Sequence, residues 1–96
     1  MTVWNNCKAD IIYYDGEADI DEHCEVKIDK DEIIVSYAGE NGPVVYKGKN
    51  NGDGHFELSA SIVNGHATLH RLKYSNILEG FWLEDGYKGM WRIKLA

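Results

Sequence analysis

The stretch ILEGFWLEDGYKGMWRIK, residues 77–94, contains the strongest fold signal in the chain. At its centre, Asp85-Gly86 is a dipeptide that favours the two-residue type I′ turn of a β-hairpin. On both sides of this turn, residues of one face alternate with residues of the other, which is typical of β-strands. Counting outward from the turn places a large ring over a glycine at two cross-strand pairs, Gly80/Trp91 and Gly89/Trp82. We therefore predict a regular antiparallel hairpin here.

The same period-two alternation continues through most of the chain, and its longest run covers residues 17–29. Turn signals separate the runs, in the order Asp15-Gly16, Lys30-Asp31, Gly39–Gly42, Asn50–Gly54 and Asn64-Gly65. A break in the alternation near His70-Arg71 predicts a β-bulge. The pattern favours an all-β protein: one domain over residues 1–96, built as an antiparallel up-and-down meander of about eight strands. Such a sheet avoids open edges by closing into a β-barrel or by flattening into a sandwich.

The two cysteines test the register of the first hairpin. A two-residue turn at Asp15-Gly16, continued without a bulge, pairs Ile11 with Ile20 and Cys7 with Cys24. In a non-hydrogen-bonded pair the Cα atoms are about 4.5 Å apart, which is within disulfide range. The alternative is a pair of buried, reduced thiols, as expected for a cytosolic protein. In both cases we expect the sulfur atoms to be close neighbours.

Composition mainly excludes classes of function. The chain has 96 residues and a formal net charge of −6, which disfavours binding to nucleic acid or to an anionic membrane. Its N-terminus lacks the basic segment followed by an apolar segment that marks a signal peptide. No apolar run is long enough to span a membrane. We therefore expect a cytoplasmic protein. No zinc, P-loop or nucleophile-elbow motif occurs, and His66 and His70 are about 13–14 Å apart along one strand. We expect no catalytic residue, metal ion or cofactor, although Glu22 alone leaves general acid/base chemistry open.

Inward-facing aromatic residues suggest a binding site. Glu22 has inner parity opposite Ala9, and Glu84 ends the inner row of its strand. A carboxylate inside a barrel is costly unless it is hydrogen-bonded. Together with aromatic rings it can line a pocket for a small molecule. The predicted ligand-binding residues are Tyr13, Glu22, Tyr37, Tyr46, Trp82 and Trp91. The alternative is that the rings fill the core and that Glu22 lies at a wet rim.

Several strands are apolar on their outer face as well. The register places Phe81 beside Met90 and Glu79 beside Arg92, the latter as a cross-strand ion pair. A contiguous apolar patch usually marks an interface, and a symmetric homodimer is the commonest case. The predicted interface residues are Ile12, Tyr14, Ile34, Val45, Ile77, Phe81, Leu83 and Met90. The alternatives are scattered exposed residues, or a patch covered by the segment Val3-Trp4.

The strand order and the segments Glu79–Trp82 and Tyr87–Trp91 resemble the glycine–tryptophan strands of calycin-like β-barrels, the avidin and lipocalin type. This resemblance is architectural, covers most of the chain and implies the barrel fold. It does not transfer a function. The inner aromatic residues and the outer apolar residues instead lead to two expected functions. One is a non-enzymatic binding protein for a small apolar or aromatic molecule. The other is a homo-oligomeric structural or protein-interaction module that has a solid core and acts through its outer patch.

Overall fold

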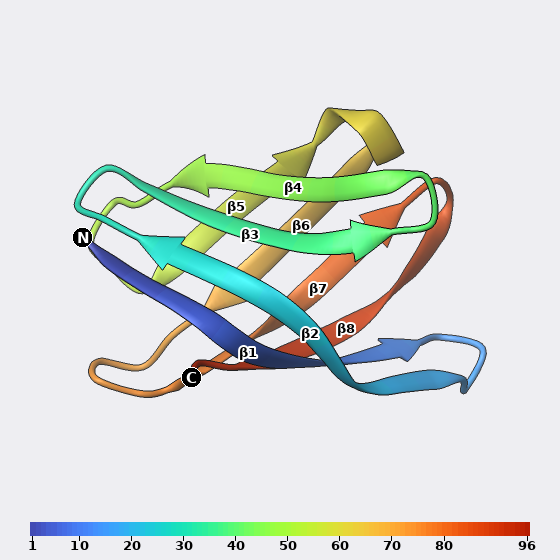
Figure 1. The fold of residues 1–96 in the computed structure, drawn as a ribbon, viewed down its shortest axis with the longest axis horizontal. Helices are drawn as coiled ribbons and strands as arrows, with labels where there is room; N and C mark the ends of the chain where they lie inside the picture. Colours follow the sequence, from blue (N-terminus) through green and yellow to red (C-terminus); the bar gives the residue numbers. More distant parts are fainter.

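A computed structural model describes all residues, 1–96, and confirms the all-β prediction. The eight strands pair in chain order and β1 also pairs with β8, so the antiparallel sheet closes into a barrel (Figure 1). A single 3₁₀ turn, η1 (Ser61–Val63), interrupts the strands. The strands are β1 (Thr2–Tyr13), β2 (Ala18–Ile28), β3 (Glu32–Gly39), β4 (Gly42–Lys49), β5 (His55–Ala60), β6 (Gly65–His70), β7 (Ile77–Glu84) and β8 (Tyr87–Lys94). No helix in the chain has the length and apolar character needed to cross a bilayer.

The β7–β8 hairpin has the predicted register, with Gly80 opposite Trp91 and Gly89 opposite Trp82. The glycines have a further role that the sequence did not reveal. A Cβ atom at Gly80 would collide with the backbone carbonyl of Thr68, and one at Gly89 would collide with that of Ile12. The flanking strands β6 and β1 therefore come unusually close to this hairpin.

The β1–β2 hairpin keeps only part of its predicted register. Its turn contains three residues instead of two, because the Tyr13 amide donates to the Glu17 carbonyl. As a result, Ile11 lies opposite Asp19 and not opposite Ile20. An extra residue in β2, where Asp21 has a φ of +58°, then compensates for the longer turn. Cys7 and Cys24 therefore do pair as predicted, although the assumption of a bulge-free hairpin was wrong.

Both cysteines are free and buried in the structure. Burial, followed by the neighbouring Cys7 thiol, raises the pKa of Cys24 to about 12. The two side chains behave as small apolar groups of the core, which agrees with the reduced-thiol alternative.

The β5–β6 connection differs from its prediction. The loop is Ser61–Asn64, with Ala60 opposite Gly65, instead of a two-residue turn at Asn64-Gly65. Ile62, which was expected to face inward, is 84% exposed. No bulge forms at His70-Arg71, because β6 ends at His70 and the chain enters a loop.

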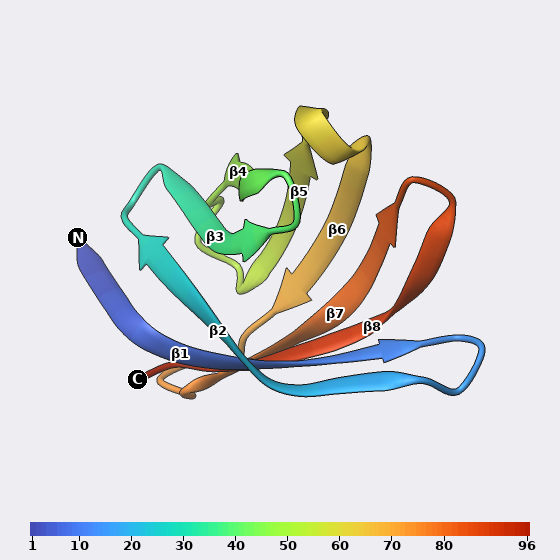
Figure 2. The ribbon, with the colours of Figure 1, turned by 45° about the vertical axis from the view of Figure 1, so that its right-hand side comes forward.

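The β2–β3 hairpin around Lys30-Asp31 and the β3–β4 hairpin at Gly39–Gly42 form as predicted. However, the β2–β3 ladder contains only four pairs, from Ile28/Ile33 to Glu25/Ser36. From Ala18 to Cys24, β2 has no partner on this side, and in Figure 2 the β1–β2 hairpin diverges from β3 and β4. We call this feature the β2–β3 break.

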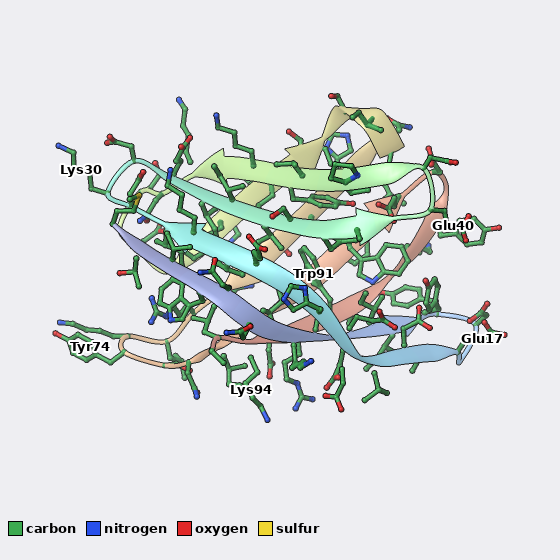
Figure 3. All side chains as sticks on the ribbon, viewed as in Figure 1. Glu17, Lys30, Glu40, Tyr74, Trp91 and Lys94 are labelled. Atoms are coloured by element: carbon green, nitrogen blue, oxygen red, sulfur yellow. The ribbon has the colours of Figure 1, made fainter.

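The inside of the barrel is filled by one core of 18 buried residues. Trp91 lies inside, whereas Lys30, Tyr74 and Lys94 project from the surface (Figure 3). The core residues are Cys7, Ala9, Cys24, Val26, Ile33, Val35, Val44, Tyr46, Phe56, Leu58, Ala60, Ala67, Leu69, Leu78, Trp82, Trp91, Ile93 and Leu95.

Candidate functional site

A tyrosine–glutamate cluster occupies one end of the barrel. The Tyr37 hydroxyl donates to Glu84 Oε1 at 2.6 Å, and the Tyr46 hydroxyl donates to the same oxygen at 3.4 Å. The β1–β2, β3–β4 and β7–β8 turns lie at this end, which is at the right in Figure 1. We call this end, together with the adjoining β2–β3 break, the mouth.

The hydroxyl groups of the mouth are held in the protonated form. Burial and the hydrogen bond to Glu84 raise the pKa of Tyr37. Burial and the charge of Glu84 raise the pKa of Tyr46, and burial with the hydrogen bond to Asp19 raises that of Tyr13. The phenols therefore act as hydrogen-bond donors and not as proton carriers near neutral pH.

Aromatic packing fixes the rings around this cluster. The Tyr13 ring meets Trp82 edge-to-face, with centroids 5.1 Å apart, and the Trp82 indole donates to the Met90 carbonyl at 3.2 Å. Deeper in the barrel, Trp91 packs on Tyr46 at 5.6 Å and donates to the Thr68 carbonyl at 3.1 Å. Five of the six predicted ligand-binding residues thus fall into two contacting sets: Tyr13 with Trp82, and Tyr37 and Tyr46, through Glu84, with the buried Trp91.

Glu22 does not lie inside the barrel but takes the alternative position at a wet rim. It pairs with Ala9, as the sequence indicated, but its side chain is exposed instead of lying inside the barrel. The reason is the β2–β3 break, because no strand covers the inner face of β2 at this position. Residues directly opposite each other share a face of the sheet, so Glu22 is on the face of buried Ala9, at the rim of the mouth.

The outside of the barrel has shallow surface hollows, and two of them have the following lining residues. One, of about 190 Å³, is lined by Lys49, Asn51, His55 and Glu57. The other, of about 260 Å³, lies over β5, β6 and β7. It is lined by Glu57, Leu58, His66, Ala67, Thr68, Phe81 and Leu83.

The predicted interface residues divide into two groups. Ile12 and Phe81 each lie opposite Met90, and the Tyr14 and Phe81 rings are 6.5 Å apart, so a connected patch runs over β1, β8 and β7. Leu83 extends this patch along β7. We call Ile12, Tyr14, Phe81, Leu83 and Met90 the outer patch.

The remaining predicted interface residues lie elsewhere. Ile77 is at the far end of β7, opposite Lys94. Ile34 and Val45 belong to β3 and β4, where they lie opposite Lys47 and Ser36. The predicted Glu79–Arg92 ion pair does form, at 3.4 Å, between two largely exposed side chains.

Sequence reasoning missed one pair of contacting histidines. His55 Nδ1 and His70 Nε2 are 2.7 Å apart, directly across the β5–β6 ladder. No local sequence signal shows this pairing: the expected two-residue turn at Asn64-Gly65 would have placed His70 opposite Ser59, and the observed Ser61–Asn64 loop places it opposite His55. No group of three or more His, Cys, Asp or Glu side chains is arranged to hold a metal ion.

Comparisons with protein-family models, curated proteins and solved structures found no match to this chain. Function is therefore inferred from the geometry of the mouth, the outer patch and the histidine pair.

Proposed function

We propose that the protein is a non-enzymatic binding protein, built like a small calycin-like barrel, that holds a small aromatic or apolar molecule at the mouth. The observation that carries this proposal is the pair of hydroxyls from Tyr37 and Tyr46 on one oxygen of Glu84. This arrangement places an oriented carboxylate beside aromatic rings at the place where β2 and β3 part. Such a combination of apolar surface and a few fixed polar groups is typical of ligand sites.

The electrostatics of the mouth favour a ligand with a positive charge. Glu84 is half-buried and takes part in neither of the two salt bridges of the chain. Asp19 and Glu22 line the adjoining rim, so the charged groups on β2 near the mouth are also acidic. An ammonium group beside tyrosine and tryptophan rings is attracted by their π-faces, by about 0.5–2 kcal/mol.

Binding is measured with three probes of similar shape: benzyltrimethylammonium, its neutral isostere neopentylbenzene, and benzenesulfonate. We expect the cation to bind at least tenfold more tightly than the neutral probe in a titration followed by ¹H–¹⁵N NMR, with shifts centred on Tyr13, Tyr37 and Glu84. The Glu84→Gln variant retains a hydrogen-bond acceptor but loses the charge, so it is expected to lose this preference.

Glu57→Gln, on the outer surface of β5, is the matched control and leaves affinity unchanged. If the neutral probe binds as well as the cation, the site stands but its charge preference is wrong. If no probe shifts the mouth resonances, the binding function itself is wrong.

A second candidate function is supported by the outer patch. Ile12 and Met90 are each 44% exposed and lie opposite each other, and Tyr14 beside them is 61% exposed. In this alternative the protein is a homodimeric interaction module with a solid core. Phe81→Glu combined with Met90→Glu is then expected to halve the mass in light scattering, whereas Val45→Glu leaves it unchanged. A wild-type protein that is monomeric at high concentration rejects this alternative.

Either function is compatible with the cytoplasm; we propose this location, and the two buried, free cysteines support it.

A further inference from the structure

The histidine pair lies on the opposite side of the barrel wall from the core. His55 and His70 form a direct cross-strand pair, and their ring centroids are 4.6 Å apart. His70 is exposed and His55 is partly exposed, so both rings can be reached from solvent. The short distance between Nδ1 and Nε2 means that one nitrogen carries the proton and the other accepts it.

The spacing of these nitrogens fits a particular coordination geometry. Two nitrogen ligands about 2.0 Å from a metal ion lie about 2.8 Å apart when the angle at the metal is 90°, and about 3.3 Å apart in a tetrahedron. The observed distance is 2.7 Å. The distance between the two nitrogens therefore suits adjacent positions around a tetragonal ion, once the rings turn so that both lone pairs point at the ion instead of at each other. Tetragonal sites with nitrogen and oxygen ligands favour Cu²⁺ or Ni²⁺ over Zn²⁺.

The surroundings supply room and oxygen atoms. The hollow of about 190 Å³ beside His55 is lined by Asn51, Glu57 and Lys49, so water molecules can complete the coordination shell there. On the other side, Glu79 lies opposite His70 but is held by Arg92 at 3.4 Å. The net charge of −6 also favours the approach of a cation.

We propose that His55 Nδ1 and His70 Nε2 bind a divalent ion of the Cu²⁺ or Ni²⁺ class as two adjacent ligands, with water in the remaining positions. The ion takes the place of the shared proton. That proton moves to the outer nitrogen of the same ring, so a neutral pair loses no proton to solvent on binding.

The test titrates the full-length protein with CuSO₄ and follows the bound ion by electron paramagnetic resonance. We expect a tetragonal spectrum with hyperfine coupling to two imidazole nitrogens. His55→Gln and His70→Gln are each expected to lower the affinity at least tenfold. His66→Gln, an exposed histidine on the same strand, is the matched control and retains wild-type affinity.

Wild-type NMR gives a second readout that does not depend on the folding of the variants. Substoichiometric Cu²⁺ is expected to broaden the resonances around His55 and His70 first. The proposal is wrong if broadening begins at the N-terminus or at His23, or if His55→Gln binds Cu²⁺ as tightly as the wild type.

Discussion

The β1–β2 and β7–β8 hairpins both turn at an Asp-Gly dipeptide, yet they fold differently. In β7–β8, Asp85 and Gly86 have φ angles of +49° and +88°, as a type I′ turn requires, and eight pairs follow without a shift. In the β1–β2 turn only Gly16 has a positive φ, the turn gains a residue, and the ladder shifts twice. The same dipeptide therefore does not decide the turn by itself.

The difference lies in what flanks each hairpin. β7 and β8 are paired along their outer sides with β6 and β1, and the carbonyls of Thr68 and Ile12 approach Gly80 and Gly89 closely. The first half of β2 has no neighbour beyond β1. A strand held on both sides keeps one register, whereas a strand with a free edge can take up a bulge at little cost.

The largest expected effect is at the closely packed hairpin. Gly89→Ala forces a Cβ atom against the Ile12 carbonyl, so we expect a loss of about 3 kcal/mol in the free energy of unfolding. Gly16→Ala is the matched change in the other hairpin, where no atom lies within 4 Å of the added Cβ and only the φ of +94° is strained. We expect about 1 kcal/mol there. Urea unfolding measures both, and equal losses would contradict the comparison.

A smaller effect is expected from the indole hydrogen bond. Trp91→Phe removes the donor to the Thr68 carbonyl and leaves space in the core, for a loss of about 2 kcal/mol. Tyr13→Phe removes an exposed hydrogen bond to Asp19 in the β1–β2 hairpin. It should change the unfolding free energy by less than about 0.5 kcal/mol. A Tyr13→Phe loss as large as that of Trp91→Phe would show that the two hairpins are equally constrained.

Unfolding at alkaline pH tests the burial of Cys24, which lies where the β1–β2 hairpin joins the rest of the barrel. The Cys24 pKa of about 12 in the folded protein lies above the value of about 8.5 expected in the unfolded chain. The folded state therefore keeps its proton longer, and stability is complete below pH about 8.5 and falls as pH rises toward 12. We expect a loss of about 1–2 kcal/mol by pH 10, since one pKa unit corresponds to about 1.4 kcal/mol. Cys24→Ala should reduce the fall in unfolding free energy with rising pH. An unchanged fall would mean that the tyrosines, and not Cys24, cause it.

Thiol labelling at pH 8 provides the companion measurement. Neither cysteine is expected to react in the folded protein, and both should react after denaturation. Finding no free thiol after denaturation would show that Cys7 and Cys24 are joined.

The smallest expected effect concerns the bulge of β2. Asp21 has a φ of +58° while its amide donates to Asp10 Oδ1 at 3.0 Å. Asp21→Gly relieves the backbone strain and keeps that bond, so a gain of about 0.5 kcal/mol is expected. Asp19→Gly, at an ordinary strand position of the same hairpin, should lose stability instead. A loss at both positions would mean that the bulge is not strained.

Prediction from sequence succeeded where local signals agreed. Three hairpins had the predicted register because the residues in their turns and the alternation on both sides point to the same pairing. Inner parity alone was enough to place Tyr13, Tyr37, Tyr46 and Trp82 on the inner face, where they lie in or against the core. It did not reveal that Glu84, and not Glu22, is the carboxylate that accepts hydrogen bonds from Tyr37 and Tyr46.

The failures have a common cause. The η1 turn places Ile62 in solvent and sets His55 opposite His70, and nothing in the local pattern distinguishes it from a two-residue turn at Asn64-Gly65. The exposure of Glu22 depends on where β3 leaves β2, which is a long-range feature of the closed sheet.

The sequence by itself determined the number and order of the strands, which face of each strand is apolar, and the hairpin between β7 and β8. These properties depend on period-two alternation and on turn residues, which act over a few neighbouring positions. Only the tertiary structure decided the closure of β1 on β8, the break between β2 and β3, and the meeting of Tyr37 and Tyr46 on Glu84. Those features join residues far apart in the chain, so they depend on how the whole sheet twists and closes.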